Sequence, residues 1–190
     1  TRENLTGDGW FKTGDIAEMD DNGYIRIVDR KKLLIVLDSG KNVSQARLEA
    51  LCSTSPLIDQ VAIIGQDREY ISALIVPNFD FILRVLRNHG IPYDESQVVY
   101  QDINGISTCV EVGPDITQND LIRLAVQDQI DMINSKLKDY EAIKAFRLLR
   151  HRFCEENGEL SHANKLKIKN ILERYQDIID DMYKAQMSLN

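Results

Sequence analysis

Two short apolar runs fix the centre of this chain. Residues 61–65 (VAIIG) and 71–76 (ISALIV) are separated by the polar segment QDREY, a pattern that favours two buried strands joined by a turn. Helical patterns lie on both sides of them. Ser44 can cap a helix that runs to about Cys52, and Asn78 can cap a second helix that Gly90 ends. The chain must therefore fold so that helices cover a small sheet.

Other segments add further strands. The sequence DDNG lies between two alternating runs, 16–20 and 24–28, and Asn-Gly readily adopts positive φ, so a β-hairpin is expected there. Residues 33–37 (LLIVL) predict a short buried strand, and residues 145–153 (AFRLLRHRF) predict a last one. Residues 91–116 scatter Gly, Pro, Asn and Asp and show no readable pattern.

Apolar residues at helical spacing predict one amphipathic helix over residues 117–138 and another from residue 168 to the end of the chain. Strands and helices therefore do not alternate strictly, which favours an α+β fold over a doubly wound parallel sheet. The expected architecture is a small mixed sheet flanked by helices and preceded by a β-hairpin. With 43% apolar residues among 190, the chain can bury a core of this kind.

Composition excludes several classes of function. The formal charge of −7 argues against a general nucleic-acid binder, which would carry a basic face. Cys52, Cys109 and Cys154 are odd in number and widely spaced, so neither a disulfide framework nor a zinc site is indicated. The histidines are equally scattered, and no metal ligands are expected. A reducing, cytoplasmic setting follows from the cysteine usage.

Four short segments could carry chemistry. Asp15 in GWFKTGD could accept hydrogen bonds from two vicinal hydroxyls, such as those of a ribose. Arg30 in VDRKKLLIV has a planar fork suited to phosphate or ribose oxygens. Gly40 in LDSGKNV could let the backbone approach a ligand. Lys165 in HANKLKIKN could neutralise phosphate oxygens in a transition state. Taken singly, each is equally an ordinary turn, a charged strand edge or a solvated face.

Taken together, these segments resemble a known family. GDGWFKTGDIAEMDDNGYIRIVDRKKLLIVLDSGKNVSQARLEA is similar to the junction region of the adenylate-forming enzymes: acyl-CoA synthetases, firefly-type luciferases and nonribosomal adenylation domains. FKTGD, GYIRIVDRKK and SGKNV follow one another at the spacing of that family, and ENGELSHANKLKIKN matches the region of its lysine. The pairing of DRKK with GEL…KLK, together with YISALIVPNFD, most resembles the long-chain fatty acyl-CoA synthetase branch.

The resemblance implies a division of the chain. Residues 1–31 would be the last hairpin of a larger N-terminal adenylation domain, and residues 32–190 the mobile C-terminal domain. A start without methionine also suggests a piece excised from a longer protein. Such a fragment would be inactive alone, because the phosphate loop and the acyl pocket of the family belong to the N-terminal domain.

The resemblance also implies roles for individual residues. Asp15 and Arg30 would bind the nucleotide, Lys32 would be the hinge, and Lys165 would bridge the carboxylate and the α-phosphate during adenylation. The loop facing CoA would comprise Ser39, Gly40, Lys41 and Asn42. One departure from the family is His162-Ala163-Asn164, where relatives usually carry small or hydroxyl residues.

The implied parent enzyme is an AMP-forming ligase of fatty acid metabolism. It would convert a long-chain fatty acid and ATP, with Mg²⁺, into acyl-AMP and pyrophosphate, and then transfer the acyl group to CoA with release of AMP. Its partners would be its own N-terminal domain and these substrates, with no nucleic acid. Lipidic substrates are compatible with a peripheral place on the inner membrane face. Two alternatives stay open: a relative that loads an acyl carrier protein, and an α+β interaction module without chemistry.

Overall fold

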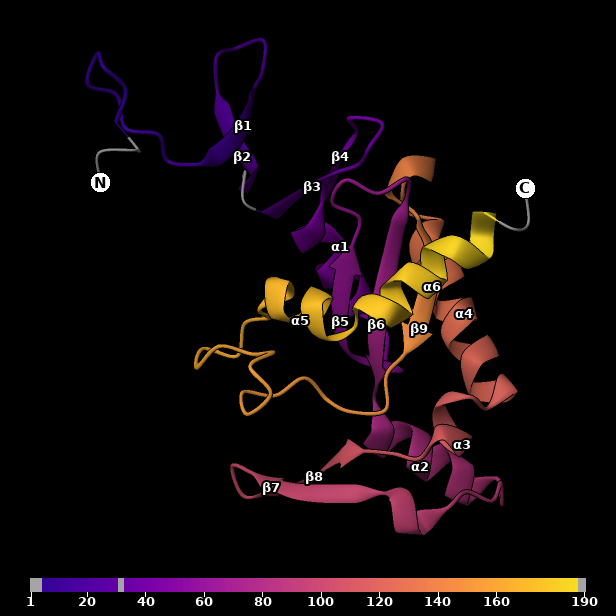
Figure 1. The fold of residues 1–190 in the computed structure, drawn as a ribbon. Helices are drawn as coiled ribbons and strands as arrows, with labels where there is room; N and C mark the ends of the chain where they lie inside the picture. The colour runs from indigo at the N-terminus through magenta and orange to yellow at the C-terminus, as the bar shows by residue number, and fades with distance from the viewer. Residues whose placement is uncertain (1–4, 31–32, 188–190) are drawn as a thin grey trace.

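A three-stranded mixed sheet forms the centre of the molecule. The computed structural model describes residues 5–30 and 33–187 (Figure 1). Strands β5 (Ile58–Ile64), β6 (Ile71–Pro77) and β9 (Ile143–Leu148) lie in the order β5-β6-β9. β5 and β6 pair antiparallel, whereas β6 and β9 pair parallel. The predicted α+β class with a small mixed sheet is confirmed, and so are the two central strands.

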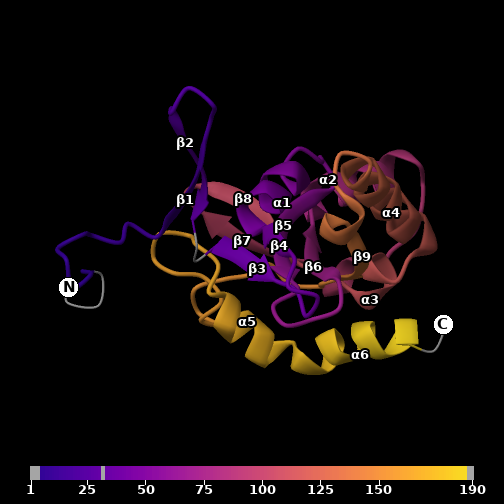
Figure 2. The ribbon, with the colours of Figure 1, turned by 90° about the horizontal axis from the view of Figure 1, so that it is seen from above.

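Helices cover both faces of this sheet (Figure 2). Helices α1 (Gln45–Cys52) and α4 (Asp120–Asn134) bury their apolar residues with Ala73 and Ile75 of β6. On the other face, α6 (Gln176–Met187) packs against the alternate residues of the same strand, which join a second apolar cluster. Because successive side chains of a strand point to opposite faces, β6 supplies both cores and all its residues are buried.

The caps expected from the sequence are confirmed. Ser44 Oγ accepts a hydrogen bond from the N–H of Arg47 (3.3 Å) at the start of α1. Asn78 Oδ1 accepts one from the N–H of Phe81 (3.1 Å) at the start of α2 (Phe79–Asn88). Gly90 follows the end of α2 at φ 64°, a conformation that glycine adopts without strain.

Two predicted helices are divided. Instead of one helix over residues 117–138, the chain forms α3 (Pro114–Thr117) and α4, because Asn119 accepts a hydrogen bond from Leu121 N–H and begins a new helix. The C-terminal stripe likewise divides into α5 (Ile168–Arg174) and α6, with a break at Tyr175. The sequence pattern located the buried faces but not these breaks.

Two strand predictions need correction. The run 33–37 is not a fully buried strand: β3 (Leu34–Val36) pairs with β4 (Asn42–Ser44) in a two-stranded sheet, and only alternate residues are buried. Leu33 and Val36 remain 39% and 37% exposed. The last strand, β9, ends at Leu148 rather than at residue 153, because residues 150–152 pair with residues 110–112 instead.

The stretch 91–116 is ordered and contains a hairpin that sequence reasoning missed. A short 3₁₀ turn (Glu95–Gln97) precedes β7 (Val99–Ile103) and β8 (Ile106–Glu111), which pair antiparallel. Asn104 and Gly105 connect them with φ of 55° and 82°. Asn-Gly between two runs is the strongest short-range hairpin signal, and here it was available in the sequence. A second 3₁₀ turn, Asp139–Glu141, precedes β9.

The N-terminal hairpin lies apart from the central sheet (Figure 1). β1 (Asp15–Met19) pairs antiparallel with β2 (Ile25–Arg30), close to the predicted bounds. Met19, Tyr24 and Ile25 are each more than two thirds exposed, at 72%, 74% and 71%. Clustered exposed apolar side chains of this kind mark a surface made to contact other protein. The predicted domain boundary, between residues 31 and 32, lies outside the described residues.

Gly65 is the position where the core leaves no room for a side chain. A Cβ added there would lie 2.5 Å from Ile71 Cδ1 and 3.0 Å from Ile35 Cγ2. We expect Gly65→Ala to lower the free energy of unfolding by about 1–3 kcal/mol through overpacking, measured by urea denaturation. Gly7→Ala is the control, since nothing lies within 4 Å of a Cβ there. Equal stabilities of the two variants would contradict this packing.

Candidate functional site

Lys165 stands on a tight loop whose two ends are bridged. Leu160 and Leu166 form an antiparallel bridge, and the N–H of Ser161 donates to the carbonyl of Lys165 (2.8 Å). The N–H of Lys165 in turn donates to Ser161 Oγ (3.2 Å). The lysine is exposed. Its backbone is therefore fixed while its ammonium is free to reach a group outside this chain.

The fully buried carboxylate of Glu159 supports this loop through hydrogen bonds. Glu159 has no exposed surface, and its Oε1 accepts a hydrogen bond from the hydroxyl of Tyr175 (3.0 Å). Its Oε2 accepts one from the N–H of Cys154 (3.2 Å), and Arg174 Nε lies 3.4 Å from Oε1. Burial, followed by the nearby Glu159 charge, raises the pKa of Tyr175 to about 12, so the hydroxyl keeps its proton and can donate.

Backbone contacts tie the same loop to the start of α5. The N–H of Lys167 donates to the carbonyl of Glu159 (2.8 Å), and Asn170 Nδ2 donates to the carbonyl of Gly158 (2.7 Å). Sequence reasoning missed this bracing role of Glu159. Its one sequence signal is a lone acid between Gly158 and Leu160, and a single charged residue does not reveal that it will be buried.

The unusual residues before the lysine have identifiable places. His162 Nδ1 lies 2.8 Å from Glu155 Oε2, and Asn164 takes φ 54°, a conformation that asparagine tolerates better than most residues. Lys167 and Lys169 are exposed, and Lys169 lies 3.8 Å from Glu173 one helical turn on. That fits the interpretation of these two lysines as a solvated face.

The Gly40 loop is held at both ends and open at its tip. The N–H of Leu37 donates to the carbonyl of Lys41 (2.9 Å), and the N–H of Gly40 donates back to the carbonyl of Leu37 (2.9 Å). Gly40 has φ 77°, and nothing lies within 4 Å of a Cβ placed on it. Ser39, Lys41 and Asn42 are exposed around it. A ligand could therefore approach this backbone closely.

The two candidate nucleotide-binding residues face each other across the N-terminal hairpin. Asp15 and Arg30 are direct Cα partners in the β1–β2 register, beside an irregularity between Ile16 and Ala17. The structure therefore brings these two positions together, as a shared ligand would require. The candidate hinge, Lys32, lies outside the described residues.

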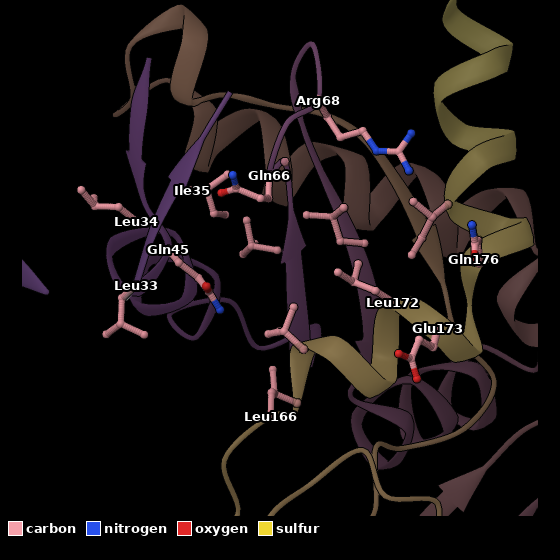
Figure 3. A pocket seen from close by; sticks show the side chains of 15 residues that line it. Leu33, Leu34, Ile35, Gln45, Gln66, Arg68, Leu166, Leu172, Glu173 and Gln176 are labelled. Atoms are coloured by element: carbon pink, nitrogen blue, oxygen red, sulfur yellow. The ribbon is translucent and has the colours of Figure 1, made fainter. Parts of the chain in front are cut away.

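An apolar groove lies next to the loop that carries Lys165 (Figure 3). It has a volume of about 590 Å³ and lies between β3 and β5 on one side and α5 and α6 on the other. Leu33, which follows the candidate hinge directly, and Leu166, which follows Lys165 directly, both line it. Gln45, Gln66, Arg68, Glu173 and Gln176 contribute its polar groups.

Comparison with protein families gives one match. Residues 32–84 match the model described as "AMP-binding enzyme C-terminal domain". This stretch contains the Gly40 loop and the first two strands of the central sheet.

Curated relatives match almost the whole chain. The long-chain-fatty-acid–CoA ligase FadD15 of Mycobacterium tuberculosis is 32% identical over 179 residues, which are 94% of this chain and 27% of that protein. Fatty acyl-CoA synthetase A of Dictyostelium discoideum is 28% identical over 193 residues, covering 96% of this chain and 26% of that protein. The chain thus spans about a quarter of the length of these relatives.

Solved structures share the fold. The A-PCP didomain of carboxylic acid reductase from Segniliparus rugosus, in complex with AMP, superposes with a TM-score of 0.69 at 26% identity. The match covers 99% of this chain and 22% of that one. The adenylation domain of a carboxylate reductase from Mycobacterium chelonae gives a TM-score of 0.68 at 24% identity, over 97% and 24% of the two chains.

Proposed function

We propose that this chain, whose residues 32–84 match an AMP-binding enzyme C-terminal domain, is the mobile C-terminal part of an adenylate-forming long-chain fatty acid–CoA ligase. The observation that carries the proposal is Lys165, exposed on a loop that a buried carboxylate braces, in the segment that resembles the lysine region of the family. The fatty-acid relatives support the choice of substrate class. In this proposal residues 1–31 belong to the preceding domain and residues 32–190 move.

The first half-reaction, formation of the acyl-adenylate, needs a positive charge beside the α-phosphate of ATP. A fatty acid carboxylate oxygen attacks the α-phosphorus of ATP, the bond to pyrophosphate breaks, and negative charge builds on the phosphoryl oxygens. A positioned ammonium stabilises that charge, and Lys165 supplies it from its braced loop. Asp15 accepts hydrogen bonds from the ribose hydroxyls, and Arg30 on the facing strand binds the same nucleotide.

The second half-reaction does not need the lysine. The thiol of CoA attacks the acyl carbonyl, and AMP leaves with the bonding electrons. A domain that turns about residue 32 can withdraw Lys165 and bring the Gly40 loop to the pantetheine, so that one site serves two reactions. Ser39, Lys41 and Asn42 surround that open backbone.

Within residues 5–30 and 33–187 no group of three or more His, Cys, Asp or Glu side chains could hold a metal ion. No helix in the described part is long and apolar enough to cross a membrane. Peripheral association of the full-length enzyme with a membrane stays part of the proposal.

A carrier-protein acceptor is the second candidate. It is favoured by the similarity to an adenylation domain that is joined to a PCP domain in the solved structure. An interaction module without chemistry is disfavoured, because it would not require FKTGD, DRKK, SGKNV and the lysine in one order.

An assay of the full-length protein with palmitate, ATP, Mg²⁺ and either CoA or a holo carrier protein distinguishes the two candidate functions. We expect palmitoyl-CoA together with AMP and pyrophosphate. Thioester formation on the carrier alone would favour the second candidate. Absence of both AMP and pyrophosphate, in a preparation that is folded, would show that the proposed chemistry is wrong.

The hinge has its own test. Proline fixes φ near −65°, so Lys32→Pro should slow thioester formation roughly tenfold, about 1.4 kcal/mol of activation free energy, while adenylation changes less. Lys32→Arg is the control, since it keeps both the charge and the backbone freedom. If the Lys32→Pro variant catalyses both half-reactions at the wild-type rate, the hinge is not at Lys32.

A further inference from the structure

A second groove follows the free edge of the central sheet. It has a volume of about 840 Å³ and is lined by the consecutive residues 144–151, which begin in β9. Figure 2 shows α4 and α6 on opposite sides of the sheet with β9 between them. Residues of both helices, including Gln127 of α4 and Met182 of α6, form the walls. The floor of this groove is therefore a strand edge rather than a sheet face.

Backbone groups of β9 point into this groove. The N–H of Leu149 donates to the carbonyl of Ile75 in β6 (2.8 Å), so the odd-numbered residues here face β6. Because the direction of backbone groups alternates along a strand, Phe146 and Leu148 present their N–H and C=O groups to the other edge, where the carbonyl of Phe146 accepts a hydrogen bond from the Arg147 side chain. Within the described residues no strand pairs with that edge of β9.

The same edge already accepts a strand farther along. The N–H of Val112 donates to the carbonyl of Arg150, and the N–H of Arg152 donates to the carbonyl of Val110, each at 2.9 Å. Glu111 and His151 form an antiparallel bridge between them. The backbone that directly follows β9 therefore already pairs with another strand on this side, so its geometry accommodates an added strand.

The groove is cationic in an acidic protein. The chain carries a formal charge of −7, yet no carboxylate is among the side chains that line this groove. Its basic residues are Arg123, Lys144, Arg147, Arg150 and His151. Four of the five have an acidic partner at the rim: Asp120 lies 3.7 Å from Arg123, Asp139 pairs with Lys144, and Glu111 pairs with Arg150 and His151. In the described part of the chain, no carboxylate lies within 4.0 Å of the guanidinium of Arg147, which instead donates to the carbonyl of Phe146 (3.1 Å).

We propose that this groove binds an extended acidic segment of a partner protein, which adds to the central sheet as a strand beside β9. Main-chain hydrogen bonds to the open edge would supply affinity, and the surrounding cations would select acidic side chains. Apolar residues of the segment would contact Ile178, which is 37% exposed, and Met182. The proposal is independent of the fatty acid chemistry.

Two other occupants fit less well. A small phosphorylated molecule would leave the backbone groups of the strand edge without partners along most of the groove. An anionic lipid surface is broad and would also face Asp120, Asp128 and Asp131, which are exposed on α4 and would repel it, whereas no carboxylate lines the groove that a single strand would occupy.

A synthetic peptide of about ten residues, alternating glutamate and valine, tests the cationic surface. With a fluorescent label, its binding to the 190-residue chain is followed by anisotropy. Arg147→Glu and Arg123→Glu should each weaken binding roughly tenfold or more, since each places a like charge against the peptide. Arg84→Glu, on the exposed side of α2, makes the same change in net charge outside the groove and should leave binding unchanged. Equal loss in all three variants, or no binding to the wild-type chain, would overturn the proposal.

Backbone methylation of the peptide tests the added strand. Two versions are N-methylated at alternate residues, so that each has hydrogen-bond donors on one edge only. We expect one version to lose binding and the other to keep it. If both bind like the unmodified peptide, charge alone holds it and the strand proposal fails. Binding of pyrophosphate or of anionic phospholipid vesicles in place of the peptide would likewise overturn it.

Discussion

Replacing Lys165 by alanine in the full-length enzyme should lower the rate of acyl-adenylate formation by roughly 10²-fold or more, the scale of losing one transition-state charge contact. The reason is local. The loop between Leu160 and Leu166 is closed by a backbone bridge, so it will keep its shape when the exposed side chain is shortened. The loss should therefore fall on catalysis and not on folding. The rate of pyrophosphate release, measured with saturating fatty acid and ATP, checks it.

Two neighbouring lysines provide matched controls. Lys167 and Lys169 are exposed like Lys165, carry the same charge and lie within four residues of it. Lys167→Ala and Lys169→Ala should change the rate of acyl-adenylate formation little. A loss in either control as large as that in Lys165→Ala would mean that net positive charge, rather than one positioned ammonium, matters to the reaction.

Replacing Glu159 by alanine should produce the largest loss of stability, about 2–4 kcal/mol in the free energy of unfolding, because it removes a fully buried acceptor and leaves two hydrogen-bond donors without a partner. The change removes the acceptor of the Tyr175 hydroxyl and of the Cys154 N–H, and it leaves Arg174 without its buried partner. Urea denaturation of the 190-residue chain, followed by circular dichroism, measures the effect.

Glu159→Gln separates hydrogen bonding from charge. Its amide keeps one acceptor oxygen of similar position, so we expect a smaller loss than in Glu159→Ala. In the full-length enzyme, Glu159→Gln should still slow adenylation, because the base of the Lys165 loop is then held less firmly. A stability of Glu159→Ala within 0.5 kcal/mol of wild type, the range of ordinary surface substitutions, would contradict the bracing role.

Local signals explain what the sequence predicted correctly. Ser44 and Asn78 cap helices through their own side chains, and the two central strands are continuous apolar runs, so each is decided within a few residues. The N-terminal hairpin follows from Asn-Gly in the same way. Such features need no knowledge of the rest of the chain.

The features that could not be predicted from the sequence depend on contacts between residues far apart in the chain. The burial of Glu159 depends on contacts with Arg174 at the end of α5 and Tyr175 at the break after it, fifteen and sixteen residues away. No periodicity in the sequence predicts those contacts. The open edge of β9 reflects the absence of a fourth strand among residues 5–30 and 33–187, which is a property of the whole sheet. The hairpin after residue 98 is different, since its Asn104-Gly105 turn was a readable signal.

The candidate site was predicted from the family resemblance more than from the residues themselves. Pairing of Asp15 with Arg30 across the hairpin is compatible with a shared nucleotide, and the open Gly40 loop is compatible with an approaching ligand. Their roles stay predictions, as does that of Lys32. Spacing alone left Lys165 indistinguishable from its neighbours, and only its braced loop sets it apart in the structure.

The most direct measurement is the rate of thioester formation by the full-length Lys165→Ala variant when pre-formed acyl-adenylate and CoA are added. If the C-terminal domain turns between the two half-reactions, Lys165 has left the active site before thioester formation begins. The variant should then form thioester at close to the wild-type rate while its adenylation is roughly 10²-fold slower. Equal slowing of both half-reactions would contradict a lysine that serves only the first.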